Sequence, residues 1–213
     1  MIKAWIADVS PLYLEEKLKK VYNTLPHFRQ IKADNIKSAD KKAQSAGVWF
    51  LLEKVREKYG ISEKAVFNLS HTGDYVVCSV DMNENEDTFL GVDAEVIHEV
   101  PLKLAKRFYC KGEYEHLLNT DEKERQEELI RIWVLKESFM KATRKGTALG
   151  TDTFEFDLKG SAKIIKKPSE YKSEFFFMEY VPCGINCRVA VCSTDSDICD
   201  HIDMEFLDLF KNI

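Results

Sequence analysis

The sequence predicts an α+β protein made of two similar α+β halves. Stretches in which apolar and polar residues alternate, typical of half-buried strands, are mixed with stretches in which apolar residues recur every three or four positions, typical of helices. The order repeats once: AGVWFLLEKVREKYG precedes FNLS and YVVCSV, and IRIWVLKESFMKATRKG precedes FEFDL and RVAVCST, each helix carrying the pattern Trp-x-x-x-Glu. This repeat indicates halves at residues 1–101 and 102–213, joined near 99–104.

In the first half, alternation predicts strands at residues 3–9, 66–69, 75–80 and 89–96, and helical spacing predicts helices at 10–25 and 40–59. Pro26 ends the first helix, and Gly60 suits the left-handed position after the second. The segment SHTGD, residues 70–74, predicts a turn between two of the strands.

In the second half, a helix at 102–118 with a break near Gly112 precedes a long helix from Asp121 to Gly146, where Asp121 and Glu124 have capping-box spacing. The remaining segments predict strands at 154–158, 162–166, 174–180 and 187–192, followed by an amphipathic helix at the end of the chain, through residues 202–213.

The composition excludes two broad classes of function. The net charge of −5 argues against a general nucleic-acid binder, which needs a basic face to displace counterions. No apolar run approaches the roughly 20 residues needed to span a bilayer. The first residues, MIKAWIADVSP, lack the basic and apolar regions of a signal peptide, so we expect a cytoplasmic protein.

The six cysteines are then expected to be reduced thiols. Four of them lie in the last third of the chain and raise the question of zinc: Cys183, Cys187, Cys192 and Cys199. No CxxC pair occurs, and Cys187 and Cys192 have an odd offset on one strand, which points them to opposite faces. Buried thiols are the interpretation that this pattern favours, with a zinc site as the alternative.

The helix at residues 131–146 carries the first candidate functional groups. Its buried stripe consists of Ile132, Leu135, Phe139 and Ala142. At about 100° per residue, Glu137, Lys141 and Arg144 fall within roughly 60° of one another, away from that stripe. This face is either a solvated surface with an ordinary Glu–Lys pair or one wall of a site.

A second acidic group lies on the strand at residues 89–96. Asp93 and Glu95 share one face, about 6.6 Å apart along the chain, and Gly91 on the same face leaves room for a close approach. On a wet surface the pair has no special meaning. With Glu137 as a third carboxylate, the set forms a good octahedral site for Mg²⁺ and a poor one for zinc.

The segment SHTG supplies two hydroxyls, an imidazole and backbone N–H groups around a glycine. Such a turn can bind an anion, or it can be a plain hairpin turn with His71 in solvent. Phosphate donors, a divalent ion and an ammonium group together suit phosphoryl transfer, in which catalysis is mostly positioning and charge neutralisation.

The series FNLSHTG, GVDAE, RFYCKGEY and RIWVLKESFMKATRKG, from Phe67 to Gly146, resembles the Sfp-type 4′-phosphopantetheinyl transferases. That family carries an (F/N)xSHS-like turn, a GxDxE strand, an RFF…E segment and a WxxKEA/S…K helix. The resemblance implies a pseudodimer with the active site between its halves. It also implies transfer of the phosphopantetheine arm of coenzyme A to a serine of an apo acyl or peptidyl carrier protein, with release of adenosine 3′,5′-bisphosphate.

The resemblance assigns roles position by position. It implies Mg²⁺ ligands at Asp93, Glu95 and Glu137. It implies contacts with coenzyme A, or places near it, for seven residues: Ser70, His71, Lys136, Lys141, Arg29, Lys32 and Lys42. The chain lacks the GKP-type segment that cradles adenine in many members, which leaves Lys64 as a candidate substitute.

Glu137 is the candidate base for the serine proton, and Lys141 would offset the charge of the departing phosphate. A basic patch for an acidic carrier protein is expected at Arg144, Lys145, Lys163, Lys166 and Lys167, unless these are merely exposed cations. Two other classes stay open: a non-catalytic protein that binds coenzyme A and a carrier protein, and a Mg²⁺-dependent phosphoanhydride hydrolase. Both halves in one chain favour a monomer over the family's small trimeric synthases.

Overall fold

The computed structural model describes all 213 residues. Its first half contains three strands and three α-helices in the order β1 (Ile2–Asp8), a 3₁₀ turn (Ser10–Tyr13), α1 (Glu15–Thr24), α2 (His27–Asp34), α3 (Ala39–Tyr59), β2 (Phe67–Thr72) and β3 (Tyr75–Asp81). The left-handed Gly60 ends α3, as expected.

The second half begins with a strand that leads into three helices and ends in four strands. These elements are β4 (Leu90–Val96), α4 (Leu102–Phe108), α5 (Lys111–Asn119), α6 (Arg125–Ala142), a 3₁₀ turn (Gly146–Leu149), β5 (Glu155–Asp157), β6 (Lys163–Lys166), β7 (Phe176–Tyr180) and β8 (Cys187–Ser193). No helix has the length and apolar character that crossing a membrane requires.

Two antiparallel sheets of three strands repeat the same arrangement. The orders are β1-β3-β2 and β4-β8-β7, so each half places its last strand in the middle of its sheet. This repetition confirms the fold class. The short β5-β6 hairpin has no counterpart in the first half, and it contains the FEFDL segment that the sequence repeat had matched to β2. The counterpart of β2 is β7.

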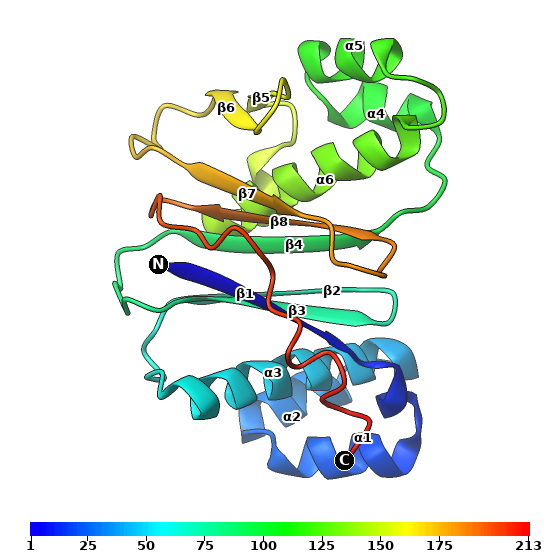
Figure 1. Ribbon diagram of the computed structural model, residues 1–213, viewed down its shortest axis with the longest axis vertical. Helices are drawn as coiled ribbons and strands as arrows, with labels where there is room; N and C mark the ends of the chain where they lie inside the picture. Colours follow the sequence, from blue (N-terminus) through cyan, green and yellow to red (C-terminus); the bar gives the residue numbers. More distant parts are fainter.

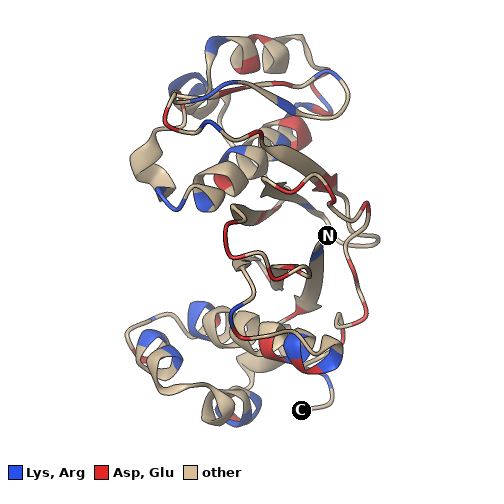
Figure 2. Cartoon of the chain, turned by 90° about the vertical axis from the view of Figure 1, so that its left-hand side faces the viewer, with Lys and Arg blue, Asp and Glu red and all other residues tan.

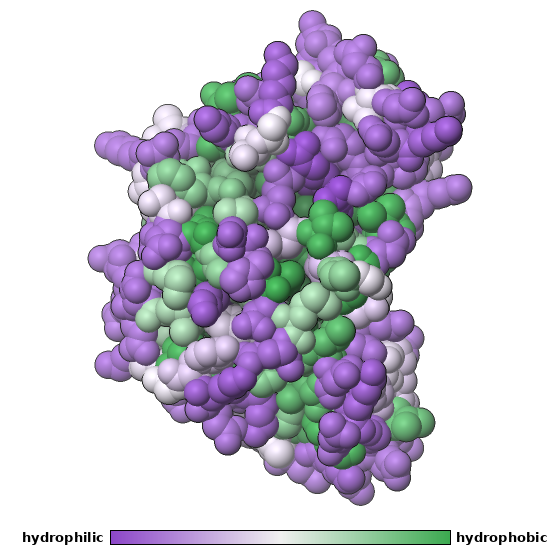
Figure 3. All heavy atoms as spheres, in the orientation of Figure 1, coloured by the Kyte–Doolittle hydropathy of each residue, from purple (hydrophilic) through white to green (hydrophobic).

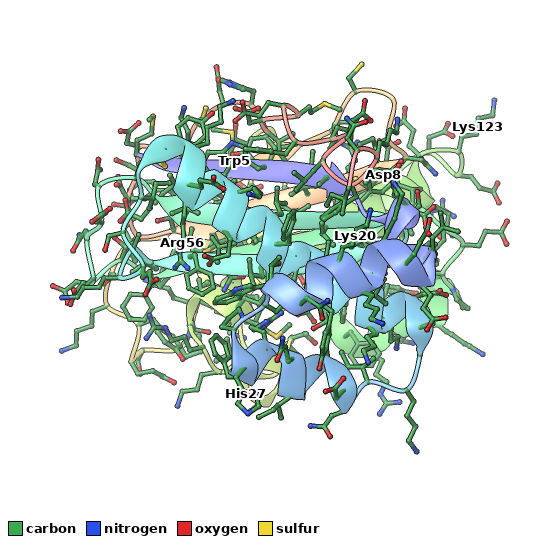
Figure 4. All side chains as sticks on the ribbon, turned by 90° about the horizontal axis from the view of Figure 1, so that it is seen from below. Trp5, Asp8, Lys20, His27, Arg56 and Lys123 are labelled. Carbon is green, nitrogen blue, oxygen red and sulfur yellow. The ribbon has the colours of Figure 1, made fainter.

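The molecule is layered, with α1–α3 on the first sheet and α6 on the second (Figure 1). Seen from below, helices α1–α3 lie across the first sheet (Figure 4). One hydrophobic core lies under α3, a second lies between the sheets, and a third lies under α6. On the face drawn in Figure 3, hydrophobic residues gather over the middle of the molecule, where the sheets lie.

Strand β4 alternates as the sequence predicts. Leu90, Val92 and Ala94 are buried in the core between the sheets. The residues between them, including Asp93 and Glu95, therefore turn to the opposite face, the side of α6. Because β4 pairs with β8, the acidic strand belongs to the second sheet, and the sheets divide between β3 and β4 rather than after residue 101.

The segment SHTGD is mostly strand and not a five-residue turn. Ser70, His71 and Thr72 lie in β2, where Thr72 pairs with Tyr75, so only Gly73 and Asp74 make the turn. Gly73 has a φ of +50°, which suits glycine. The β-branched Thr72 favours the extended backbone, and pairing with β3 carries the strand through it.

The predicted C-terminal helix is wrong. Residues after 203 form turns, and the chain before them runs beside β1, where the Ile6 amide bonds to the Asp203 carbonyl and the Asp203 amide to the Ala4 carbonyl. Backbone bonds to the free edge of β1 replace those of a helix. Phe210 is fully buried in the core of the first half, which accounts for the apolar pattern.

Helix α6 begins at Arg125 rather than at Asp121. The Asp121 carboxylate accepts a hydrogen bond from the Lys123 amide at 2.9 Å and makes a local turn instead of a capping box. A capping box occurs at the start of α5, where Glu113 accepts from the Cys110 amide. Helix α2 was not expected, because no apolar stripe marks residues 27–34.

The six cysteines form no disulfide. Of the four cysteines in the last third, Cys187 and Cys192 are buried as expected, whereas the expectation is wrong for Cys183, which is exposed, and for Cys199, which is only partly buried. The cysteines do not cluster as a zinc site would require. The one close group of potential metal ligands lies at the surface and consists of Cys199, Asp200 and His201.

Candidate functional site

The candidate site begins at the contact between β4 and α6. A β-carbon added to Gly91 would stand 2.0 Å from the Ser138 carbonyl oxygen and 2.5 Å from the Ala142 amide nitrogen. Because Gly91 has no side chain, the backbone of α6 can lie directly against β4 at this point. This contact places Glu137 and Lys141, on either side of Ser138, over the acidic residues of β4.

Lys141 is the centre of the site. Its ammonium group donates to the Asp93 carboxylate at 2.7 Å, to the Ser70 hydroxyl at 2.9 Å and to the Val92 carbonyl at 3.0 Å. The Ser70 hydroxyl donates to the same Asp93 oxygen at 2.9 Å. Three elements, β2, β4 and α6, thus meet at one ion pair that is largely buried, as expected of a charged pair away from water.

The other two carboxylates share the electrostatic field of Asp93. Burial raises the pKa of Glu137, and the Asp93 and Glu95 carboxylates add to the rise, against the opposite effect of Lys141. Burial and Asp93 likewise raise the pKa of Glu95. Three acidic groups around one ammonium leave an excess of negative charge.

This donor set fits a hard divalent cation. All three ligands are carboxylate oxygens, the type that Mg²⁺ prefers; burial first, and neighbouring carboxylates second, raise the pKa values of Glu95 and Glu137. The three do not form a group with ligand atoms within 4.8 Å of one another, and Asp93 is turned toward Lys141 and Ser70. Asp93, Glu95 and Glu137 are the residues that could hold the ion.

His71 connects this cluster to helix α2. Its side chain reaches solvent, but burial of the ring and the Lys141 ammonium lower its pKa, and Lys32 contributes in the same direction. Burial lowers the pKa of Lys32, and neighbouring Arg29 adds to that effect. Lys32 makes no ion pair, and its charge acts on the imidazole only electrostatically; a free cation and an imidazole that face one site suit a phosphate.

Arg29 is more deeply buried than a surface cation. It is 7% exposed, donates to the Ser45 carbonyl at 2.8 Å and lies over the Trp49 ring at 4.8 Å. Its Nε atom has no partner. Figure 2 shows that Lys and Arg lie on helices of both halves.

Two predicted cofactor contacts do not join the site. Lys42 pairs with Asp34 at 2.9 Å and packs on the Tyr22 ring. Lys136 is fully buried, pairs with Glu113 at 2.8 Å and donates to the carbonyl groups of Thr151 and Phe154. The expectation that Lys136 faces the cofactor is therefore wrong: its ammonium group holds α6 to α5 and to the segment before β5.

A cavity of about 280 Å³ adjoins the acidic cluster. Glu95 and His98 form part of its wall, and most of the lining is apolar. The principal apolar side chains come from α4, α6 and the turn between α4 and α5: Leu104, Phe108, Tyr109, Ile130 and Trp133. The site thus places charged groups next to an apolar hollow.

Two further residues structure the site: Asn68, which the sequence did not single out, and Thr72, whose hydroxyl was expected in a turn and lies in a strand. Their side chains accept hydrogen bonds from β4 amides, in series with Ser70. The signal was the polar alternation Asn-x-Ser-x-Thr, which identifies one face of a strand once the segment is interpreted as extended.

Residues 89–184 match the family model of the 4′-phosphopantetheinyl transferase superfamily. The chain is 33% identical over 141 residues to the 4′-phosphopantetheinyl transferase Sfp of Bacillus subtilis strain 168. That alignment covers 66% of this chain and 60% of the relative. The chain is 29% identical over 196 residues to a second 4′-phosphopantetheinyl transferase of Bacillus subtilis, covering 89% of this chain and 84% of that one. The chain thus spans less than two thirds of the first relative and most of the second.

Among solved structures, the holo-[acyl-carrier-protein] synthase of Thermotoga maritima aligns with a TM-score of 0.40 and 22% identity. That alignment covers 49% of this chain and 61% of the other.

Proposed function

We propose that the chain belongs to the 4′-phosphopantetheinyl transferase superfamily and that it transfers the 4′-phosphopantetheine arm of coenzyme A to a serine of an apo acyl or peptidyl carrier protein. The observation that carries the proposal is the meeting of Asp93, Glu95, Glu137 and Lys141 where α6 lies on β4. We place the reaction in the cytoplasm and expect a monomer.

Mg²⁺ is the proposed metal, held by Asp93, Glu95 and Glu137. When bound, it would polarise the pyrophosphate of coenzyme A and neutralise charge on the leaving group. The chain's own cations would complete the neutralisation. Lys141 is aimed into the cluster, and Lys32 and His71 lie on the side of α2.

The proposed reaction breaks one P–O bond and forms another. The serine oxygen attacks the β-phosphorus, the bond from that phosphorus to the bridging oxygen breaks, and adenosine 3′,5′-bisphosphate departs with the bridging oxygen. Glu137 accepts the serine proton. Its position on α6, close enough to Asp93, Glu95 and Lys141 for their charges to act on its carboxylate, supports that role.

Two further features of the site suit different parts of coenzyme A. The apolar cavity beside Glu95 suits the long uncharged part of the pantetheine arm. The Ser70 hydroxyl already makes three bonds within the protein, so a phosphate contact there would replace one of them.

A basic surface for the carrier protein is smaller than the sequence suggested. Lys145, Lys166 and Lys167 line one hollow, whereas Arg144 lines another with Lys64. We propose that the first group meets the acidic carrier protein, so that docking weakens with added salt.

The proposed function is tested by measuring coenzyme A consumption with and without an apo carrier protein, in the wild type and in one variant. Wild-type protein should consume coenzyme A with Mg²⁺ only when an apo carrier protein is present, which separates transfer from hydrolysis of a phosphoanhydride. Glu137→Gln should abolish turnover while the fold persists. Near-normal turnover of that variant, or coenzyme A cleavage without a carrier, would contradict the proposal.

A further inference from the structure

Three different metal-ligating side chains meet at the surface, away from the candidate site. Cys199, Asp200 and His201 are consecutive residues after β8, and one ligand atom from each lies within 4.8 Å of the other two. We call these three residues the Cys199 cluster. The cluster lies beside β1, whereas the acidic residues of β4 meet β2, the opposite edge strand of the same sheet.

The backbone holds the Cys199 cluster in place from both ends. The Cys199 amide donates to the Ile2 carbonyl at 2.9 Å, and the Cys199 carbonyl accepts from the Tyr180 hydroxyl at 2.7 Å. On the other side of the cluster, the Asp203 amide donates to the Ala4 carbonyl at 2.8 Å. A short turn tied at both ends presents its side chains with little backbone freedom to lose, which favours binding.

The distances within the cluster fit a tetrahedral ion. With bonds of about 2.3 Å to sulfur and about 2.0 Å to nitrogen or oxygen, two ligands of one zinc ion lie about 3.3–3.6 Å apart. The Cys199 Sγ lies 3.4 Å from the His201 Nδ1. That nitrogen lies 2.9 Å from the Asp200 Oδ1, so an ion between them requires about 0.4 Å of further separation. Asp200 is 89% exposed, and its side chain has room to make that adjustment.

The donor set selects a different kind of ion from the one that suits the acidic residues of β4 and α6. Sulfur and imidazole nitrogen suit Zn²⁺ and similar borderline-soft ions, whereas Mg²⁺ takes oxygen ligands. His201 is 70% exposed, so solvent reaches the cluster and can supply a fourth ligand. One thiol with nitrogen and oxygen ligands makes an open site, unlike a closed site of several cysteines.

We propose that the Cys199 cluster binds one Zn²⁺ ion through the Cys199 sulfur, the His201 Nδ1 and an Asp200 oxygen, with water as the fourth ligand. Binding displaces the thiol proton into solvent. The bound ion would bridge side chains of the turn that ties the end of the chain to β1. The cluster shares no residue with the proposed transferase site, so the two proposals can fail independently.

Titration of the reduced chain with Co²⁺ in the absence of oxygen tests the site, because a thiolate ligand gives Co²⁺ a charge-transfer absorption that carboxylates do not give. We expect one Co²⁺ per chain, displaced by Zn²⁺ and not by an excess of Mg²⁺. Cys199→Ser should abolish the absorption, and His201→Ala should lower Co²⁺ affinity by about tenfold or more.

Cys183 supplies the matched control, because its thiol is also exposed but belongs to no such group of ligands. Cys183→Ser should therefore keep the full Co²⁺ absorption. Zn²⁺ should raise the midpoint of thermal unfolding in wild type and in Cys183→Ser, since it binds the folded turn, and should lose that effect in Cys199→Ser.

Absence of the absorption in wild type would overturn the inference, as would its persistence in Cys199→Ser or its loss in Cys183→Ser. Unchanged affinity in His201→Ala would reduce the site to a single surface thiol and would also overturn it. Half a Co²⁺ per chain would mean that two chains share the ion, contrary to a site within one turn. An equal rise of the unfolding midpoint in Cys199→Ser would place the Zn²⁺ elsewhere.

Discussion

Gly91 lies against Ser138 so closely that a β-carbon on the glycine would stand 2.0 Å from the serine carbonyl oxygen. This contact between β4 and α6 determines where the charged residues of the candidate site lie. Glu137 and Lys141 flank Ser138, and Asp93 and Glu95 follow Gly91 on the same face of β4. The arrangement of the acidic cluster therefore depends on the absence of a side chain at Gly91.

Gly91→Ala should displace α6 and damage the site more than the fold. We expect the free energy of unfolding to fall by about 1–3 kcal/mol, the usual cost of overpacking, and kcat to fall further than the loss of folded protein explains. Urea unfolding and steady-state kinetics measure the two effects.

Gly47→Ala is the control, because its β-carbon would stand 2.5 Å from the Val9 side chain, away from the acidic cluster. It should cost stability and leave the kcat of the folded protein intact. Equal effects on kcat from both variants would contradict the role given to Gly91.

Removing the Lys141 ammonium should cost activity. In Lys141→Met, Asp93 and Ser70 lose their shared donor, and the cluster loses its one internal cation. We expect kcat to fall by about 10²–10³-fold, the usual effect of losing a donor that stabilises developing charge. Lys123→Met removes an exposed lysine just before α6 and should change nothing. A fall of less than threefold in Lys141→Met would be hard to reconcile with this site.

Lys136 should matter for folding, because it is fully buried against Glu113. Lys136→Met leaves a buried carboxylate without its cation, and we expect about 3–5 kcal/mol of destabilisation by chemical denaturation. Adding Glu113→Gln should recover much of that loss, since it removes the lone charge and keeps an oxygen for the backbone amides that Glu113 accepts from. A stable Lys136→Met variant with a raised KM for coenzyme A would instead favour a direct cofactor contact.

His71 should titrate below its usual pKa near 6.5, because burial and Lys141 disfavour the imidazolium. The unfolded chain then binds more protons than the folded one as the pH falls through 6.5, so this group lowers stability on the acid side. In an NMR titration of the imidazole, Lys141→Met should raise the midpoint. A midpoint at or above 6.5 in wild type, or one that does not respond to Lys141→Met, would refute this electrostatic account.

The parts of the site that lie on one element could be predicted from sequence. The stripe Ile132, Leu135, Phe139 and Ala142 is buried as its spacing indicates. That stripe fixes the direction of Glu137 and Lys141, and alternation on β4 does the same for Asp93 and Glu95. The periodicity of a helix or strand determines which way a side chain points, and for these four residues it was enough to identify the face of each element that forms the site.

Relations between distant elements could not be predicted in this way. Lys136 borders the buried stripe, and only the position of Glu113 on α5 explains why an ammonium group is buried there. Thr72 looked like part of a turn because Gly and Asp follow it, and its pairing with β3 overrides that local signal. The apolar residues near the C-terminus match helical spacing, but backbone bonds to β1 decide their conformation.

We propose that this site moves the phosphopantetheine arm of coenzyme A onto a carrier protein. Intact-mass spectrometry of apo carrier proteins, incubated with the protein and coenzyme A, tests it most directly. We expect a gain equal to one phosphopantetheine group with Mg²⁺, and none with a chelator or with Glu137→Gln. An unchanged carrier-protein mass across acyl and peptidyl carrier proteins, with Mg²⁺ and correctly folded protein, would contradict it.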